Sequence, residues 1–184
     1  MSEHIDPSLD QRPNIVLLHA GTNDMNPSTT IAKQGNNPSA AAGRLGKLID
    51  KIVKKCPDAT VLVAVIIGTC EPHQELNTVQ YQALIPGVVQ KRFDEGKHVL
   101  AVNFTSFPMK EMRRDCLHPT NNGYKLIGDY WYDFMTQIPK DWIKKPIGPD
   151  PDRSKEKEEE ENVASRLSFG SLAITFALLF HYLL

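Results

Sequence analysis

Three short apolar segments, separated by stretches of helix length, place the strongest constraint on how this chain can fold. They are residues 14–20, 60–67 and 98–104. In the first two, apolar residues follow one another without polar alternation, a pattern typical of strands buried on both faces of a parallel sheet. The strand–helix order occurs three times along the chain. It predicts an α/β fold with three layers, in which a parallel sheet lies between two layers of helices.

The stretches between and after these segments show the apolar spacing of helices. Ser39 is expected to cap a helix over residues 40–55. A second helix is predicted over residues 76–95. Pro86 interrupts it, and either kinks one helix or begins a new one at its first turn. The last helix is predicted over residues 119–137, with aromatic residues on its inner face.

The first strand ends in a Gly-Thr-Asn-Asp turn at residues 21–24. Gly21 permits a tight turn, and the side-chain amide of Asn23 can donate a hydrogen bond to a developing negative charge. Taken alone, the segment is better interpreted as a polar turn that caps its own backbone. His73 follows the second strand. It could contact a substrate, although a solvated loop histidine is the interpretation that we favour.

A second polar motif, Asp-Cys-Leu-His at residues 115–118, follows the third strand. Asp115 and His118 are three residues apart, so the carboxylate can hold one imidazole nitrogen and leave the other free as a general base. Right-handed crossovers bring the carboxyl ends of parallel strands to one edge of the sheet. We therefore expect Asn23, His73, Asp115 and His118 to lie along that edge.

The two motifs, in this order, make the chain resemble the SGNH (GDSL-type) hydrolase superfamily, particularly its fungal esterase members. The resemblance covers residues 13–136. It implies that Gly21 and Asn23 belong to an oxyanion hole. It also implies that Asp115 orients His118, the general base of a Ser-His-Asp triad. The expected reaction is hydrolysis of acyl esters on carbohydrate or lipid, without a metal or another cofactor.

The nucleophile of that superfamily is expected upstream of the first motif, in a Gly-Asp-Ser block, and a later block supplies a glycine to the oxyanion hole. Residues 1–20 contain neither block, and Ser2 and Ser8 lie in a polar stretch with no strand before them. We therefore expect an N-terminally incomplete esterase domain that lacks its nucleophile and is inactive by itself. The alternatives are an inactive remnant and a binding module that retains the second half of the site.

The composition argues against nucleic acid as a partner, because the net charge is −1 and the Lys and Arg residues are scattered. The three cysteines, Cys56, Cys70 and Cys116, lack the spacing of metal ligands. Cys70 and Cys116 are expected near the same sheet edge. A disulfide between them would suit an oxidising compartment, but free buried thiols are the alternative that we favour.

The chain divides by composition into an esterase-type domain over residues 1–138, a charged, proline-rich linker over 139–162 and a hydrophobic segment over 163–184. Residues 167–184 carry no Lys, Arg, Asp or Glu. As a helix they would span about 27 Å, just short of a hydrocarbon core of about 30 Å. A membrane anchor, a GPI-attachment signal and an amphipathic helix remain open. We favour membrane attachment, with the cell surface as one location. Residues 1–13 lack the apolar core of a secretory signal.

Overall fold

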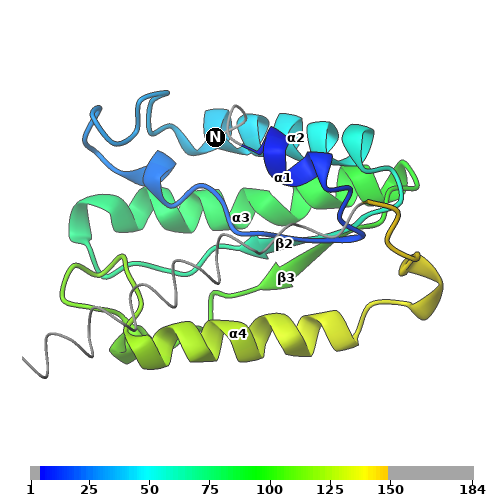
Figure 1. Cartoon of the computed structure of the whole chain (residues 1–184). Coiled ribbons are helices and arrows are strands. Elements are labelled where there is room, and N and C mark those ends of the chain that lie inside the picture. The colour runs from blue at the N-terminus through cyan, green and yellow to red at the C-terminus, as the bar shows by residue number, and fades with distance from the viewer. Residues whose placement is uncertain (1–4, 149–184) are drawn as a thin grey trace, which may run out of the picture. The chain divides into compact units, whose positions relative to one another are not determined.

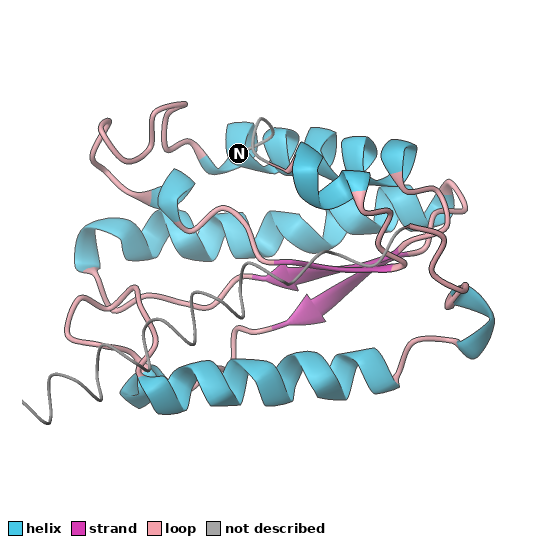
Figure 2. Ribbon diagram, viewed as in Figure 1, coloured by secondary structure: helices cyan, strands magenta, loops and turns pink. Residues whose placement is uncertain are grey.

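A three-stranded parallel sheet in the order β1-β2-β3 lies between helices on its two faces (Figures 1 and 2). The structure is a computed structural model that describes residues 5–148. The strands are β1 (Ile15–Leu18), β2 (Thr60–Val65) and β3 (Val99–Asn103). All strand pairs are parallel, so the predicted α/β fold is confirmed.

Helices α2 and α3 cover one face of the sheet together with the short α1, and α4 covers the other face (Figure 1). Apolar side chains form one buried cluster on each face, centred on residues such as Ile49 and Ile85 on the first face and Phe104 on the second. The α-helices are α1 (Asp6–Asp10), α2 (Pro38–Lys55), α3 (Pro72–Asp94) and α4 (Asn121–Thr136). Within residues 5–148, the short 3₁₀ helices are η1 (Asn23–Met25), η2 (Met109–Glu111) and η3 (Lys140–Trp142).

The prediction of burial on both faces holds for β2 and is wrong for β1. Every residue of β2 is buried, because β2 has a strand on each side and helices above and below it. No residue of β1 is fully buried, and Leu17 is 41% exposed. The reason is position: within residues 5–148, β1 pairs with β2 alone and forms an edge of the sheet.

Two helices begin earlier than predicted. Asn37, not Ser39, caps α2: its Oδ1 accepts a hydrogen bond from the Ala40 N–H at 2.9 Å. Pro38 occupies the first helical turn, where its missing N–H costs nothing. Helix α3 begins at Pro72 and is preceded by Glu71, whose Oε1 accepts a hydrogen bond from the His73 N–H at 3.3 Å.

Helix α3 is a single helix that contains Pro86, so of the two alternatives the one with a new helix at Pro86 is wrong. Its last turn is followed by Gly96 with φ +76°, as expected for a glycine that ends a helix. The last predicted helix corresponds to α4, where the Thr120 Oγ1 accepts from the Gly123 N–H at 3.0 Å.

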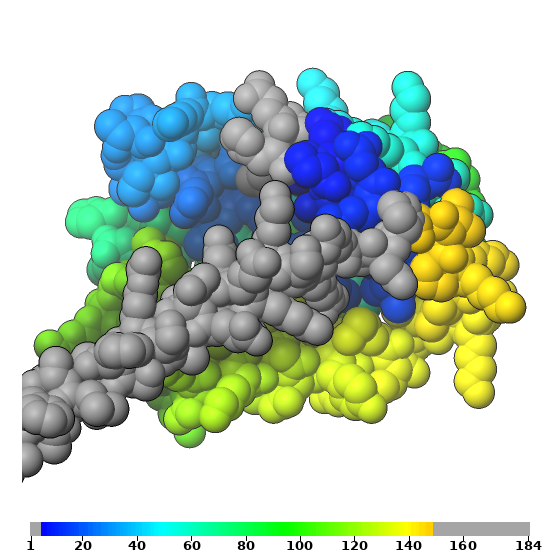
Figure 3. All heavy atoms as spheres, viewed as in Figure 1, coloured from blue at the N-terminus to red at the C-terminus, as the bar shows by residue number. Residues whose placement is uncertain are grey.

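The described part of the chain continues past residue 138, the predicted end of the esterase-type domain, to residue 148. The ring of Trp142 stacks on His98 at 4.2 Å, and the Thr60 hydroxyl donates to the Trp142 carbonyl at 3.3 Å. Asn14 Nδ2 donates to the Lys144 carbonyl at 2.6 Å, and Figure 3 shows this segment, in yellow to orange, beside the blue N-terminal segment. These contacts join residues 142–144 to the strands, whereas the domain boundary at residue 138 stays a prediction.

The remaining part of the predicted linker, residues 149–162, and the hydrophobic segment 163–184 lie outside the described residues. Within residues 5–148, no helix is long and apolar enough to cross a membrane.

Candidate active site

A pocket of about 470 Å³ lies at the carboxyl ends of the strands. Three segments supply most of it: the turn after β1, the loop after β2 and the loop that leads into α4. One face of α4 completes the wall. The lining residues are His19, Ala20, Gly21, Thr22, Asn23, Ile67, Gly68, Met112, Leu117, His118, Pro119, Tyr124, Ile127 and Trp131.

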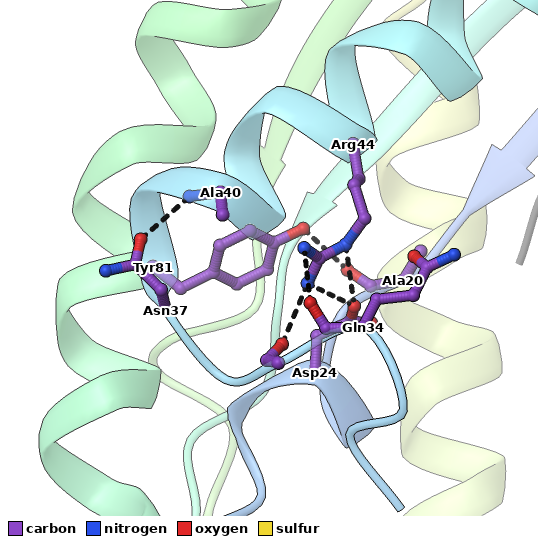
Figure 4. A network of polar contacts seen from close by, with 8 residues as sticks. Ala20, Asp24, Gln34, Asn37, Ala40, Arg44 and Tyr81 are labelled. Carbon is purple, nitrogen blue, oxygen red and sulfur yellow. Dashed lines mark hydrogen bonds and ion pairs between the residues drawn. The ribbon is translucent and has the colours of Figure 1, made fainter. Parts of the chain in front are cut away.

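The turn after β1 combines a glycine-dependent backbone with an ion pair. Gly21 has φ +117°, a conformation that favours glycine. The Asp24 N–H donates to the Gly21 carbonyl at 2.9 Å and begins the 3₁₀ turn η1. The Asp24 carboxylate pairs with Arg44 of α2 at 2.7 Å (Figure 4). Arg44 also donates to the carbonyls of Gln34 and Gly35, so α2 holds both the turn and the loop that follows it.

Asp115 and His118 form the pair that their spacing predicts. Asp115 Oδ2 lies 2.9 Å from His118 Nδ1, which leaves Nε2 as the nitrogen available for proton transfer. Asp115 Oδ1 accepts from the N–H groups of Leu117, at 3.0 Å, and His118, at 2.9 Å. The backbone hydrogen bonds from His118 and Leu117, followed by the side-chain bond from His118, lower the pKa of Asp115 to about 2. The carboxylate is therefore ionised wherever the imidazole would act as a base.

Several cross-links fix this loop to its neighbours. Cys116 forms a disulfide with Cys70, which follows β2, so the expectation of free thiols at these two positions is wrong. The Thr69 hydroxyl donates to the Cys116 carbonyl at 3.0 Å. The pairing follows from the parallel sheet, which brings the ends of β2 and β3 to the same edge. Cys56 is a free, buried cysteine.

The structure brings most of the predicted site residues together. Gly21, Asn23 and His118 line the pocket. Asp115 does not line it but contacts His118, which does. His73 does not line it and lies in the first turn of α3. In the described part of the chain, no serine or cysteine is among the residues that line the pocket. Within residues 5–148, no group of three His, Cys, Asp or Glu side chains is placed to hold a metal ion.

Sequence reasoning missed His19, which lies at the end of the first apolar segment and lines the pocket. Its Nε2 accepts a hydrogen bond from the Ile67 N–H at 3.2 Å, and its ring meets Phe104 edge-on. The pKa of His19 lies below its ordinary value because neighbouring atoms displace water from the imidazole, although part of the residue remains exposed. Its place directly before the Gly-Thr-Asn-Asp turn was the signal that could have identified it.

The chain is similar in sequence to a curated bacterial protein and in structure to solved carbohydrate esterases. A curated protein of Acetivibrio thermocellus, named as an endoglucanase, is 30% identical over 131 residues, which are 70% of this chain and 52% of that protein. A family 3 carbohydrate esterase from Clostridium thermocellum is 28% identical with a TM-score of 0.56, covering 76% of this chain and 67% of that one. A second family 3 enzyme, from Talaromyces cellulolyticus, shares the fold at 24% identity and a TM-score of 0.60, covering 72% and 62%.

The chain thus spans about half the length of the curated relative that it matches. The model of the GDSL-like lipase/acylhydrolase family matches residues 1–126, which include both polar motifs and end within α4. The superfamily expected from those motifs is confirmed, whereas the fungal subgroup stays a prediction. With its parallel sheet, its paired Asp and His and its glycine turn in place, this chain belongs to the GDSL-like lipase/acylhydrolase family.

Proposed function

We propose that this chain carries the base and the oxyanion donor of a site that hydrolyses acyl esters on carbohydrate. One observation carries the proposal: His118 is paired with Asp115 at 2.9 Å and lines the same pocket as Gly21 and Asn23. A general base and an amide donor around one pocket are what acyl transfer to a hydroxyl requires. Membership of an acylhydrolase family supports the same reaction.

In the proposed reaction, His118 Nε2 takes the proton from a serine hydroxyl, whose oxygen attacks the ester carbonyl. Asn23 stabilises the negative charge on the tetrahedral oxygen, an effect of about 3 kcal/mol for one well-placed donor. The alkoxide leaves with the proton from His118, and an acyl-enzyme remains. Water, deprotonated by the same imidazole, then releases the acid and restores the serine. Asp115 holds the imidazole and stabilises its protonated form throughout.

We propose that the serine in this scheme comes from a segment other than this chain, because the described residues that line the pocket include none. This is the basis for expecting that the chain by itself is inactive. An inactive remnant or a binding module would have the same pocket, and the absence of a lining serine is the observation that favours these alternatives.

Carbohydrate is favoured over lipid as the carrier of the acyl group. Similar solved structures include family 3 carbohydrate esterases. In this chain, Tyr124 and Trp131 form part of the pocket wall, and Tyr124 is 52% exposed. The exposed ring of Tyr124, in the same pocket as the base, offers a flat apolar surface for a sugar ring, whereas a long acyl chain would need a deeper enclosed cavity.

The test is a fusion that supplies the nucleophile. A segment with a Gly-Asp-Ser block from a relative is joined to the N-terminus, and hydrolysis of p-nitrophenyl acetate and acetylated xylan is compared with that of the unfused chain. We expect turnover from the fusion alone, reduced by about 10³-fold or more in its His118→Ala variant. The same fusion with Ala in place of the added serine is the matched control.

Two outcomes would contradict the proposal. A folded fusion that hydrolyses neither substrate would favour the binding-module alternative. Turnover by the unfused chain that is lost in His118→Ala, together with labelling by a serine-directed phosphonate, would show that the chain already contains a nucleophile.

A further inference from the structure

Two buried polar side chains of helix α3, Gln74 and Tyr81, contact the backbone of the Gly-Thr-Asn-Asp turn. Neither of them lines the pocket. Gln74 and Tyr81 are each 1% exposed. They are seven residues apart, which places them on the same face of the helix after two turns. Burying an amide and a phenol costs free energy unless both are hydrogen-bonded. Their hydrogen-bond partners therefore indicate the structural role of this face of α3.

Both side chains donate to backbone carbonyls of the turn. The Tyr81 hydroxyl donates to the Ala20 carbonyl at 3.1 Å, as Figure 4 shows, and Gln74 Nε2 donates to the Thr22 carbonyl at 2.9 Å. These two carbonyls belong to the peptide groups on either side of Gly21 and Thr22. In a planar trans peptide the C=O and N–H point in opposite directions. With the carbonyls directed toward α3, the N–H groups of Gly21 and Asn23 are directed away from it.

The pocket lies on that opposite side, because its wall includes residues of α4 and none of α3. Gly21 and Asn23 both line it. The two hydrogen bonds from α3 thus set the direction in which the turn presents its donors to the pocket.

The pair has little freedom to move. Gly21 has φ +117°, and a Cβ at this position would overlap the ring of Tyr81. Gln74 Oε1 accepts from Asn26 Nδ2 at 3.0 Å, which fixes the orientation of its amide. Burial raises the pKa of Tyr81 far above its ordinary value, so the phenol stays protonated and remains a donor.

We propose that Gln74 and Tyr81 are positioning residues, which hold the turn so that the backbone N–H groups of Gly21 and Asn23 are directed at the oxyanion before substrate arrives. This inference rests on the proposed function, in which Asn23 is the oxyanion donor. Preorganised donors stabilise a developing charge without reorganising at the moment of reaction. Loss of either carbonyl anchor leaves the turn free to rotate its peptide groups.

The test measures the donors directly and needs no turnover. Sodium acetate, whose carboxylate resembles the acid product, is titrated into the ¹⁵N-labelled chain, and the backbone N–H signals of Gly21 and Asn23 are followed. We expect acetate to shift both signals. Tyr81→Phe removes one oxygen and keeps the ring against Gly21, and Gln74→Met keeps the chain length without the donor. Each is expected to weaken acetate binding about tenfold, the effect of one hydrogen bond.

Two matched controls remove the same groups elsewhere. Gln90→Met alters an exposed glutamine of α3 that bonds Asp94, and Tyr132→Phe alters a tyrosine of α4 that is 65% exposed. Neither is expected to change acetate binding. A merely structural role for the pair would lower the melting temperature of the variants and leave their acetate affinity unchanged while they are folded.

The outcomes separate the inference from the function on which it rests. Unchanged acetate affinity in folded Tyr81→Phe would overturn the positioning role while leaving Asn23 as the donor. Acetate that shifts neither signal in the unchanged chain would overturn the donor role itself, and the inference with it. If the NMR spectrum of Gln74→Met shows that this variant is unfolded, the acetate affinity of Tyr81→Phe alone tests the positioning role, because Tyr81→Phe keeps the ring and its packing.

Discussion

Asp115 owes its ionisation mainly to the backbone of its own loop. The largest causes of its low pKa are the hydrogen bonds from the N–H groups of His118 and Leu117, and the imidazole comes after them. We therefore predict that the Asp115 carboxyl titrates with a midpoint of about 2 in the unchanged chain, and that the midpoint stays below the ordinary 3.8 in His118→Ala. The ¹³C chemical shift of the carboxyl, followed against pH, gives both values.

The sign of the stability effect follows from the direction of this shift. Because the pKa of Asp115 is lower in the folded chain than its ordinary value of 3.8, the ionised carboxylate stabilises the loop above that pH. The stabilisation is lost as the pH falls from 3.8 toward about 2. A midpoint near 3.8 in His118→Ala would show instead that the imidazole is the main cause.

The residues of the candidate site that the sequence could predict are those whose geometry is local. Asp115 and His118 are three residues apart in one loop, so their pairing needs no other element. Gln74, Tyr81 and His19 escaped prediction because their partners are distant in sequence. Tyr81 meets the Ala20 carbonyl across 61 residues, a contact that only the packing of α3 on the strand ends creates.

Among the elements, the loop after β2 and the loop before α4 are joined by the disulfide between Cys70 and Cys116, which lie 46 residues apart. A cross-link of that span stabilises mainly by restricting the unfolded chain. We predict that the double variant Cys70→Ser/Cys116→Ser lowers the free energy of unfolding by about 2–4 kcal/mol. Urea titration of the oxidised chain and the variant measures the difference.

A reductant provides the control for that prediction. The unchanged chain in excess dithiothreitol is expected to approach the stability of the double variant, while the variant does not respond. In the variant, amide exchange at Leu117 and His118 is also expected to be faster, because their N–H groups belong to the released loop. Equal urea midpoints for the oxidised chain and the variant would contradict a stabilising role for the bond.

The helices themselves were predictable from periodicity, but their starts were not. The spacing of apolar residues in α2 fixes which face is buried, whereas the first turn depends on which polar side chain reaches a free N–H. Asn37 does so because Pro38 can occupy the first helical position. Pro86 lies within α3 because the packing of that helix on α2 and the sheet outweighs one missing hydrogen bond.

At the scale of the whole molecule, membrane attachment through residues 163–184 stays a proposal, because those residues lie outside the described part. Their sequence lacks Lys, Arg, Asp and Glu after Arg166. We predict that residues 150–184 direct a soluble reporter to the membrane fraction. The same fusion with Leu178→Lys and Leu179→Lys is expected to return to the soluble fraction, since charges are costly within a bilayer. An unchanged fusion found wholly in the soluble fraction would contradict both the anchor and the GPI signal.

The order of the sheet leads to the last prediction, which concerns association. Within residues 5–148, β1 pairs with β2 on one side only, and its Leu17 is 41% exposed. The other side of an apolar edge strand presents N–H and C=O groups to which a strand of another molecule can bind. We therefore predict that residues 1–148 self-associate in sedimentation velocity, with slow amide exchange at residues 15–18 only in the associated species.

A charge on the edge strand should oppose this association, because pairing would bring it against an apolar partner. Leu17→Lys is accordingly expected to shift the sample toward monomer. Ile31→Lys is the matched control, because Ile31 is 48% exposed but lies in a loop away from the sheet. A monomer with slow exchange at residues 15–18 would mean that another part of the chain already covers this edge. That result would contradict the interpretation of β1 as an open edge, and with it the reason for expecting association.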